Sequence, residues 1–335
     1  LHSQAMASGN FGQITALALD WDSDGDQDML WLNGSLHLLR NPEGGETLQR
    51  SERATYTLGY ASAALDASLV TISEVADGLI LRLLDPQSLS ARGESEITGT
   101  GIPATGVPGL PRYSLGDFHP GYGPELLRIS PTMLHAHSLD GALLWQRPLA
   151  AGAYTSAELP SICLRECAPL IVAEYLPTGS TLRAIDGSTG NSRWTIAAGG
   201  WYQVHSVVDV VGDASPEALV VADSGDVREL WALNARDGTL TWRALLAGTT
   251  PVQDIRRGQD AVGVLYSDTT LALYSRDGRA LQSRQLQADG RCERTCALNF
   301  RSRGATDGVW IVAGDDSDFL AVAQDLKGDL TEVQL

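Results

Sequence analysis

The chain has 335 residues and carries 41 acidic against 24 basic side chains, which gives a formal net charge of −17. This charge argues against nucleic acid or an anionic membrane surface as a partner, because both would repel the protein; cations, neutral sugars and basic proteins remain compatible. No run of about 18 apolar residues is present, so we expect no membrane insertion.

At the N-terminus, residues 1–10 are set apart as a tail or vector-derived sequence, and the first informative stretch is 16–34. Five aspartates alternate along its central loop: Asp20, Asp22, Asp24, Asp26 and Asp28. Calcium takes about six to eight oxygen ligands, which alternating aspartates in a tight turn supply, and Gly25 permits the positive φ that folds the chain around the ion. Bare carboxylates this close together would repel one another. The loop therefore predicts a structural Ca²⁺ site.

The rest of the chain repeats one local pattern: an apolar strand, a short polar turn with glycine, and a second strand that often ends in tryptophan. The clearest copies lie at 137–145, 184–194 and 232–242. Weaker copies lie at 38–48, 83–91, 273–281 and 323–332. Two apolar runs precede the pattern in each unit. A period of roughly 40 to 50 residues with several short strands is what a propeller blade requires.

Runs such as 170–173 and 219–222 are apolar on successive residues, as expected for strands buried on both faces, and no stretch keeps a helical period. The sequence therefore predicts an all-β fold, a seven-bladed β-propeller of four-stranded antiparallel blades, with eight blades as the alternative count. We expect residues 11–335 to form a single domain. The predicted blades are 11–53, 54–100, 108–150, 151–199, 200–248, 249–288 and 289–335.

The four cysteines fall in two pairs of equal spacing, Cys163 with Cys167 and Cys292 with Cys296. A zinc site is compatible with this spacing, but the pairs are far apart in sequence and no histidine is near. We therefore expect two local disulfides, which form in an oxidising compartment. This favours a secreted, periplasmic or cell-surface protein.

Two family resemblances follow from these motifs. The copies at 184–194 and 232–242 resemble the repeat of PQQ-type, quinoprotein-like propellers, and the likeness covers most of the chain. The loop at 20–28 resembles the calcium loop of FG-GAP/VCBS propeller repeats. By that resemblance, Asp26 would offer its backbone carbonyl and the other four aspartates their side chains. When the same nine-residue spacing is laid on the fifth unit, Asp209, Asp213 and Glu217 fall at the positions of Asp20, Asp24 and Asp28. We expect this loop to be degenerate, with at most weak ion binding.

Aromatic and histidine side chains leave further possibilities open. Three tryptophans share one position of the repeat, which favours packing between blades: Trp145, Trp194 and Trp242. Three others are open as ligand contacts: Trp21, Trp201 and Trp231. His135 and His137 share one face of a strand and can start a metal site, but His137 aligns with the turn residues Asp186 and Asn234, which favours a structural role.

No nucleophile elbow, Walker loop or H-E-x-x-H helix is present, and no catalytic residue is assigned. A PQQ-dependent dehydrogenase is disfavoured because the chain has no adjacent cysteines. We expect a non-enzymatic bacterial binding or scaffold propeller that recognises a protein or polysaccharide through its blade loops. A scaffold would resemble the PQQ-like subunit of the bacterial outer-membrane assembly machine, which has eight blades and a lipid-anchored cysteine. The alternatives are a carbohydrate-binding lectin or adhesin and an enzyme with a channel active site.

Overall fold

The protein is described by a computed structural model, which places the backbone of most of the chain and the side chains of most residues between Val70 and Gln285. The residues described are 16–19, 28–32, 35–39, 48–53, 56–62, 65–75, 78–85, 90–98, 112–116, 118–119, 125–129, 132–149, 155–158, 169–176, 178–197, 200–258, 261–285, 296–300, 308–314, 319–325 and 330–334. Only the backbone is described before Val70, at Glu74, in 112–116 and 155–158, and from 296 onward.

Every regular element among these residues is a β-strand, and the strands form four-stranded sheets in chain order. The first sheet contains β1 (Ala16–Leu19), β2 (Asp28–Leu32), β3 (Ser35–Leu39) and β4 (Leu48–Arg53). The second contains β5 (Tyr56–Ser62), β6 (Leu65–Val75), β7 (Gly78–Leu84) and β8 (Ala91–Thr98). The third contains β9 (Arg112–Gly116), β10 (Glu125–Ile129), β11 (Met133–Ser138) and β12 (Leu143–Pro148).

The remaining sheets follow the same plan. The fourth contains β13 (Thr155–Glu158), β14 (Leu170–Leu176), β15 (Gly179–Ile185) and β16 (Ser192–Ala197). The fifth contains β17 (Trp201–Val208), β18 (Glu217–Asp223), β19 (Arg228–Asn234) and β20 (Leu240–Leu245). The sixth contains β21 (Val252–Arg257), β22 (Ala261–Tyr266), β23 (Thr270–Ser275) and β24 (Ala280–Gln285). The seventh contains β25 (Cys296–Phe300), β26 (Gly308–Gly314), β27 (Phe319–Asp325) and β28 (Leu330–Gln334).

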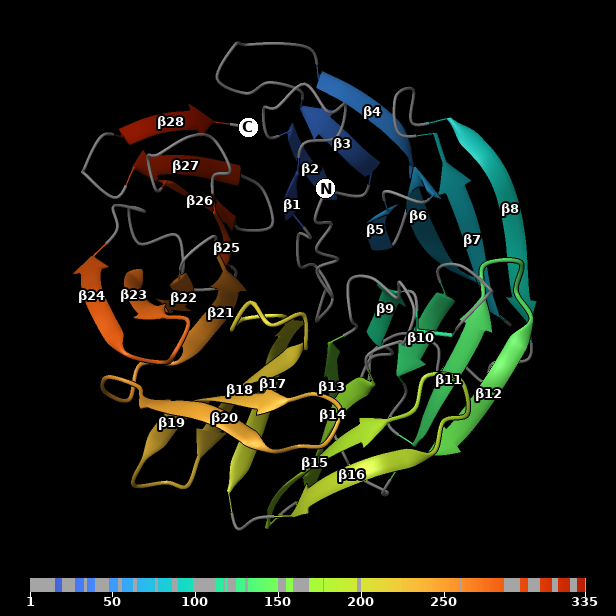
Figure 1. Cartoon of the computed structure of the whole chain (residues 1–335). Coiled ribbons are helices and arrows are strands. Elements are labelled where there is room, and N and C mark those ends of the chain that lie inside the picture. The colour runs from blue at the N-terminus through green and yellow to red at the C-terminus, as the bar shows by residue number, and fades with distance from the viewer. Residues whose placement is uncertain are drawn as a thin grey trace.

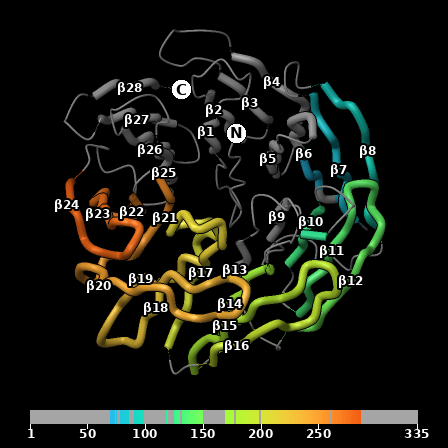
Figure 2. Tube along the Cα trace, viewed as in Figure 1, coloured from blue at the N-terminus to red at the C-terminus, as the bar shows by residue number. Residues whose placement is uncertain are grey.

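The sheets stand around a common centre, each with its first strand innermost and its fourth strand at the rim (Figure 1). From the second sheet to the sixth, the chain follows the ring in one direction, sheet after sheet (Figure 2). All strand pairs within the sheets are antiparallel, as in the pairing of β17 with β18. The prediction of an all-β propeller with antiparallel four-stranded blades is confirmed, and we call the sheets blades one to seven.

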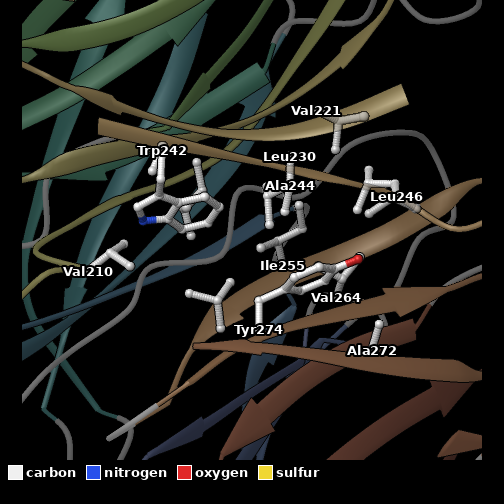
Figure 3. Packing of buried hydrophobic residues seen from close by; sticks show 14 of the residues in the cluster. Val210, Val221, Leu230, Trp242, Ala244, Leu246, Ile255, Val264, Ala272 and Tyr274 are labelled. Atoms are coloured by element: carbon white, nitrogen blue, oxygen red, sulfur yellow. The ribbon is translucent and has the colours of Figure 1, made fainter. Parts of the chain in front are cut away.

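The hydrophobic core lies between the blades rather than within one of them. Side chains of blade five, such as Leu230 and Trp242, meet Ile255, Val264 and Tyr274 of blade six in one cluster (Figure 3). All five residues of β10 are buried, as are the first six of β18. A strand covered by neighbouring blades on both faces has no solvated side, which explains the unbroken apolar runs.

The repeated tryptophans connect neighbouring blades. Trp145 donates its indole N–H to the carbonyl of Gly187 in blade four at 2.5 Å, and Trp194 donates to Ala235 in blade five at 2.9 Å. The turn glycine Gly238 has a φ of 76°, and a Cβ added there would lie 2.9 Å from the Trp194 ring. Only glycine satisfies both the positive φ and the close approach. The predicted packing role of these tryptophans is confirmed.

Candidate functional site

The predicted calcium and disulfide sites lie almost entirely outside the described residues. Of the five aspartates, only Asp28 belongs to a described strand, as the first residue of β2, where its backbone pairs with Leu19. Of the four cysteines, only Cys296 does, as the first residue of β25, paired with Ala313. Both sites therefore stay predictions. Among the described residues, no group of three or more His, Cys, Asp and Glu side chains is placed to hold a metal ion.

The fifth-blade loop shows how a turn of this kind closes through its own carboxylates. Asp209 accepts the backbone N–H of Gly212 at 2.6 Å and that of Ala214 at 3.1 Å. Glu217 accepts the N–H of Val210 at 2.8 Å. Burial raises the pKa of the Glu217 carboxyl, and this N–H partly opposes the shift. The carboxylates at the frame positions Asp209 and Glu217 thus bind the backbone of their own loop.

One member of the blade-three histidine pair, His137, lies in the packed interior, while His135 is only partly buried. The rings of His135 and His137 lie 6.1 Å apart, and His137 is buried. Burial is the main cause that lowers the pKa of His137 to about 4; the nearby Gly141 backbone opposes the shift more weakly, and neither ring nitrogen has a hydrogen-bond partner of normal geometry. The arrangement supports the structural interpretation of this histidine.

The alignment behind that interpretation was wrong by one residue. Ala136 lies opposite Trp145 just as Ala184 lies opposite Trp194, so Ser138, and not His137, occupies the position of Asp186. The Ser138 hydroxyl accepts the N–H of Ala142 at 3.2 Å and thereby holds the turn. Blades three, four and five share the same bulge opposite the tryptophan, but the turn of blade three is one residue shorter than those of blades four and five. Counting back from the tryptophan therefore shifts the alignment by one residue.

An exposed tryptophan stands out at the junction of blades four and five. Trp201 begins the innermost strand β17 and is 46% exposed, while the next residue, Tyr202, is buried. Exposure of a large aromatic ring is unfavourable in water, so such a residue on a folded surface is a candidate contact for a partner or ligand.

The backbone on both sides of Trp201 is fixed by one buried serine of blade four. Ser180, the second residue of β15, donates its N–H to the carbonyl of Gly200 at 2.8 Å. Its hydroxyl accepts the N–H of Tyr202 at 2.6 Å. A Cβ on Gly200 would lie 2.8 Å from the carbonyl oxygen of Asp223, so glycine is needed at this position. These contacts hold the start of β17 in one place.

The Trp201 ring is also supported from the side. It stacks on Tyr175 of β14, with ring centroids 6.2 Å apart and planes 25° from parallel. Across the ladder, Trp201 pairs with Asp223, the last residue of β18. Trp201, Tyr175 and Asp223 therefore lie together at the end of the propeller that carries the β14–β15 and β18–β19 hairpins. We call these three residues, with Ser180, the Trp201 platform.

The sequence indicates Trp201 as a candidate contact but does not predict the other residues of the platform. Trp231, also left open, is only partly buried; it packs against the core between blades four and five and donates its indole N–H to Glu229 at 2.8 Å. Trp21 lies outside the described residues. Tyr175 and Ser180 belong to a different blade from Trp201, and no spacing in the sequence signals contacts between blades.

Comparison with known proteins places this fold in a family. Residues 133–326, more than half of the chain, match the family described as outer membrane protein assembly factor BamB, and the chain belongs to this family of PQQ-like β-propellers. The matched region contains the whole Trp201 platform. No curated protein sequence matches the chain significantly.

Solved structures with a similar fold are only distantly related in sequence. BamB from Moraxella catarrhalis is 16% identical, over 98% of this chain and 92% of that one, with a TM-score of 0.47. The Dos1 propeller is 9% identical, over 90% and 76%, with a TM-score of 0.59. The dihydro-heme d1 dehydrogenase NirN, in complex with DHE, is 12% identical, over 92% and 64%, with a TM-score of 0.52. At these identities the last two likenesses show the propeller fold alone.

In the part of the chain that the structure describes, no helix has the length and apolar character needed to cross a membrane.

Proposed function

We propose that this chain is a non-enzymatic scaffold propeller of the bacterial periplasm, which binds a protein partner through the end of blades four and five. The observation that carries the proposal is the match of residues 133–326 to a family described as an outer membrane assembly factor. Within that region, the Trp201 platform supplies what a protein interface needs: an exposed aromatic side chain held in one conformation before binding.

In this proposal, the predicted calcium ion and disulfides stabilise the fold and do not take part in binding. The loop at Asp20–Asp28 would hold Ca²⁺ and rigidify blade one, and the pairs Cys163–Cys167 and Cys292–Cys296 would form in the oxidising periplasm. Mass spectrometry of a non-reducing digest tests the disulfides directly. Four free thiols would contradict both the pairing and the compartment.

A second candidate function is carbohydrate binding, favoured by the same exposed ring, because sugar rings also pack on tryptophan faces. An enzymatic role has weaker support: NirN shares the fold, but fold alone does not carry function. No described cluster of side chains forms a catalytic constellation that we can assign. We therefore place protein binding first.

Site-specific photocrosslinking tests the proposal. A photoreactive residue replaces Val227, which is 44% exposed in the β18–β19 hairpin beside the platform, and in the control it replaces Val211, which is 38% exposed at the opposite end of blade five. With envelope extract of the source organism, position 227 should give a discrete crosslinked protein that position 211 does not. The crosslink should be reproduced with the purified, identified partner and lost with Trp201→Ala. If no protein is crosslinked and the chain binds glycans on an array, with that binding lost in Trp201→Ala, the carbohydrate function is established instead.

A further inference from the structure

We infer that the Trp201 platform binds a positively charged side chain, arginine or lysine, presented by a segment of the protein partner. This rests on the proposed protein-binding function and names the chemistry that the partner must bring. Three features support it. Carboxylates lie near the exposed ring, the nearby described arginines already bind groups of this chain, and the backbone on both sides of Trp201 is held in place.

Carboxylates accompany the exposed ring. Asp223 lies opposite Trp201 in the β-ladder, and its side chain remains 38% exposed. One of its oxygens accepts the N–H of Gly225 at 2.8 Å, which fixes the carboxylate at the base of the hairpin. Asp226 is exposed in the same hairpin, and Asp268 is exposed in the corresponding hairpin of blade six. One carboxylate thus lies directly opposite Trp201, and two more are exposed in the hairpins at the same end of blades five and six.

The described arginines near this end are already engaged. Arg228, 15% exposed, donates to the carbonyl of Thr250 at 2.7 Å and lies 3.6 Å from Asp223. Arg183 forms a 3.1 Å ion pair with the buried Glu174. Arg243, toward the rim, lies 3.6 Å from Glu229. Among the described residues, the ion pairs include no cation for the carboxylates of Asp226 and Asp268. The described exposed charge in these two hairpins is therefore negative.

An aromatic face flanked by carboxylates matches the two properties of an arginine or lysine side chain. The cation is attracted to the indole face, and its N–H groups can donate to a carboxylate. Trp201 stacks on Tyr175 and still remains 46% exposed, so part of the ring is accessible to an incoming group. Because Ser180 fixes the backbone on both sides, little conformational freedom is lost on binding.

Charge also decides between a cation and a neutral sugar. A neutral sugar would gain nothing from the net charge of −17, whereas a cationic segment is drawn toward this surface and its association weakens as salt screens the attraction. Salt dependence therefore distinguishes the two occupants of the same ring.

Fluorine NMR of the full chain, labelled with fluorotryptophan in calcium-containing buffer, tests the inference. The Trp201 resonance is assigned from the Trp201→Phe variant. The probes are an acetylated Gly-Arg-Gly-Arg-Gly amide, its citrulline analogue, which keeps the shape but lacks the charge, and maltohexaose. The arginine peptide should shift the Trp201 resonance, and the citrulline peptide and maltohexaose should not. Raising NaCl from about 50 to about 300 mM should weaken the binding.

Two sets of variants, each with its own control, complete the test. Asp223→Asn and Asp226→Asn should each weaken the peptide binding about two- to fivefold, the range of an exposed ion pair. Glu96→Gln, an exposed carboxylate on the outer strand of blade two, should leave it unchanged. Trp201→Ala should abolish binding, while Leu240→Ala, an equally exposed apolar residue at the other end of blade five, should not.

The outcomes separate this inference from the proposed function. A Trp201 resonance that responds to maltohexaose but not to the arginine peptide, or equally to arginine and citrulline peptides, would overturn the cationic chemistry. If the crosslinked partner still binds with Asp223→Asn and Asp226→Asn combined and without salt dependence, the inference is wrong but the scaffold function stands. If position 227 crosslinks no protein at all, the proposed function itself fails.

Discussion

Trp194 donates its indole N–H to the carbonyl of Ala235 at 2.9 Å, whereas the buried N–H of Trp242, at the same position of the next blade, has no acceptor. The difference lies in the turn that each ring meets. The turn of blade five runs from Asn234 to Gly238, while that of blade six, from Ser275 to Gly278, is one residue shorter. The shorter turn brings its glycine closer to the ring but presents no carbonyl to the N–H.

This contrast predicts unequal costs for two identical substitutions. Trp194→Phe removes a hydrogen bond and leaves the carbonyl of Ala235 without that donor, whereas Trp242→Phe removes none. Both lose similar ring area, so Trp194→Phe should lower the free energy of unfolding by about 1 kcal/mol more than Trp242→Phe. Urea unfolding followed by circular dichroism measures the difference. Equal losses would show that the hydrogen bond contributes nothing to stability.

Local strain in the fifth-blade loop gives a second prediction. Ala214 has a φ of 68°, a conformation that costs an L-residue about 1 kcal/mol or more and that glycine adopts freely. Ala214→Gly should therefore raise the free energy of unfolding by about 0.5 to 1 kcal/mol, after the greater flexibility of glycine in the unfolded chain is subtracted. Thermal melting tests this: the melting temperature of Ala214→Gly should be higher than that of the parent protein.

The control for this change is Ala247→Gly. Ala247 is exposed in the connection between blades five and six and does not have a positive φ. Glycine there only increases the entropy of the unfolded chain, so this variant should melt slightly lower than the parent protein. A lower melting temperature for both variants would contradict the strain assigned to Ala214.

Much of the fold could be predicted because its determinants are local. Alternating strand and turn signals recur in every unit, and the turn glycines Gly141, Gly190, Gly238 and Gly278 all have the positive φ that their place in the pattern implies. The apolar runs at 170–173 and 219–222 are buried on both faces, as their composition indicates.

The Trp201 platform could be predicted only in part, because its parts come from two blades. The sequence distinguishes Trp201 as a tryptophan outside the repeated position, but its stack on Tyr175 depends on how β14 lies against β17. The hydrogen bonds of Ser180 depend on the same placement. Polar and aromatic residues contribute here at single positions, without a period, so only coordinates bring them together.

The buried histidine of blade five predicts a loss of stability in mild acid. His205 sits in a bulge of β17, beside the buried ion pair of Asp254 and Arg256, and its Nε2 has no hydrogen-bond partner. Burial lowers its pKa to about 4, although the Asp254 carboxylate opposes this shift.

The direction of the pH effect on stability follows from the difference between the folded and unfolded pKa values of His205. In the unfolded chain His205 takes up its proton near pH 6.5, but in the folded protein only near pH 4. Its contribution is fully present above pH 6.5 and is lost as the pH falls toward 4, by as much as about 3 kcal/mol. Urea unfolding across this range should show a shallower pH slope for His205→Gln than for the parent protein, even if the variant is less stable at neutral pH. An unchanged slope would mean that this histidine does not control acid sensitivity.

Removal of calcium tests the remaining prediction, for the loop from Asp20 to Asp28. An ion that binds only the folded state stabilises it by an amount set by its concentration relative to the dissociation constant, about 2.7 kcal/mol at a hundredfold excess. A chelator should therefore lower the melting temperature, and the combined Asp22→Asn and Asp24→Asn variant should melt low with or without chelator.

The control is Asp213→Asn, in the fifth-blade loop where Asp209 and Glu217 bind backbone N–H groups; this variant should keep the full response to chelator. A parent protein that melts at the same temperature after chelation would remove the calcium site, and a response lost with Asp213→Asn would move it to blade five.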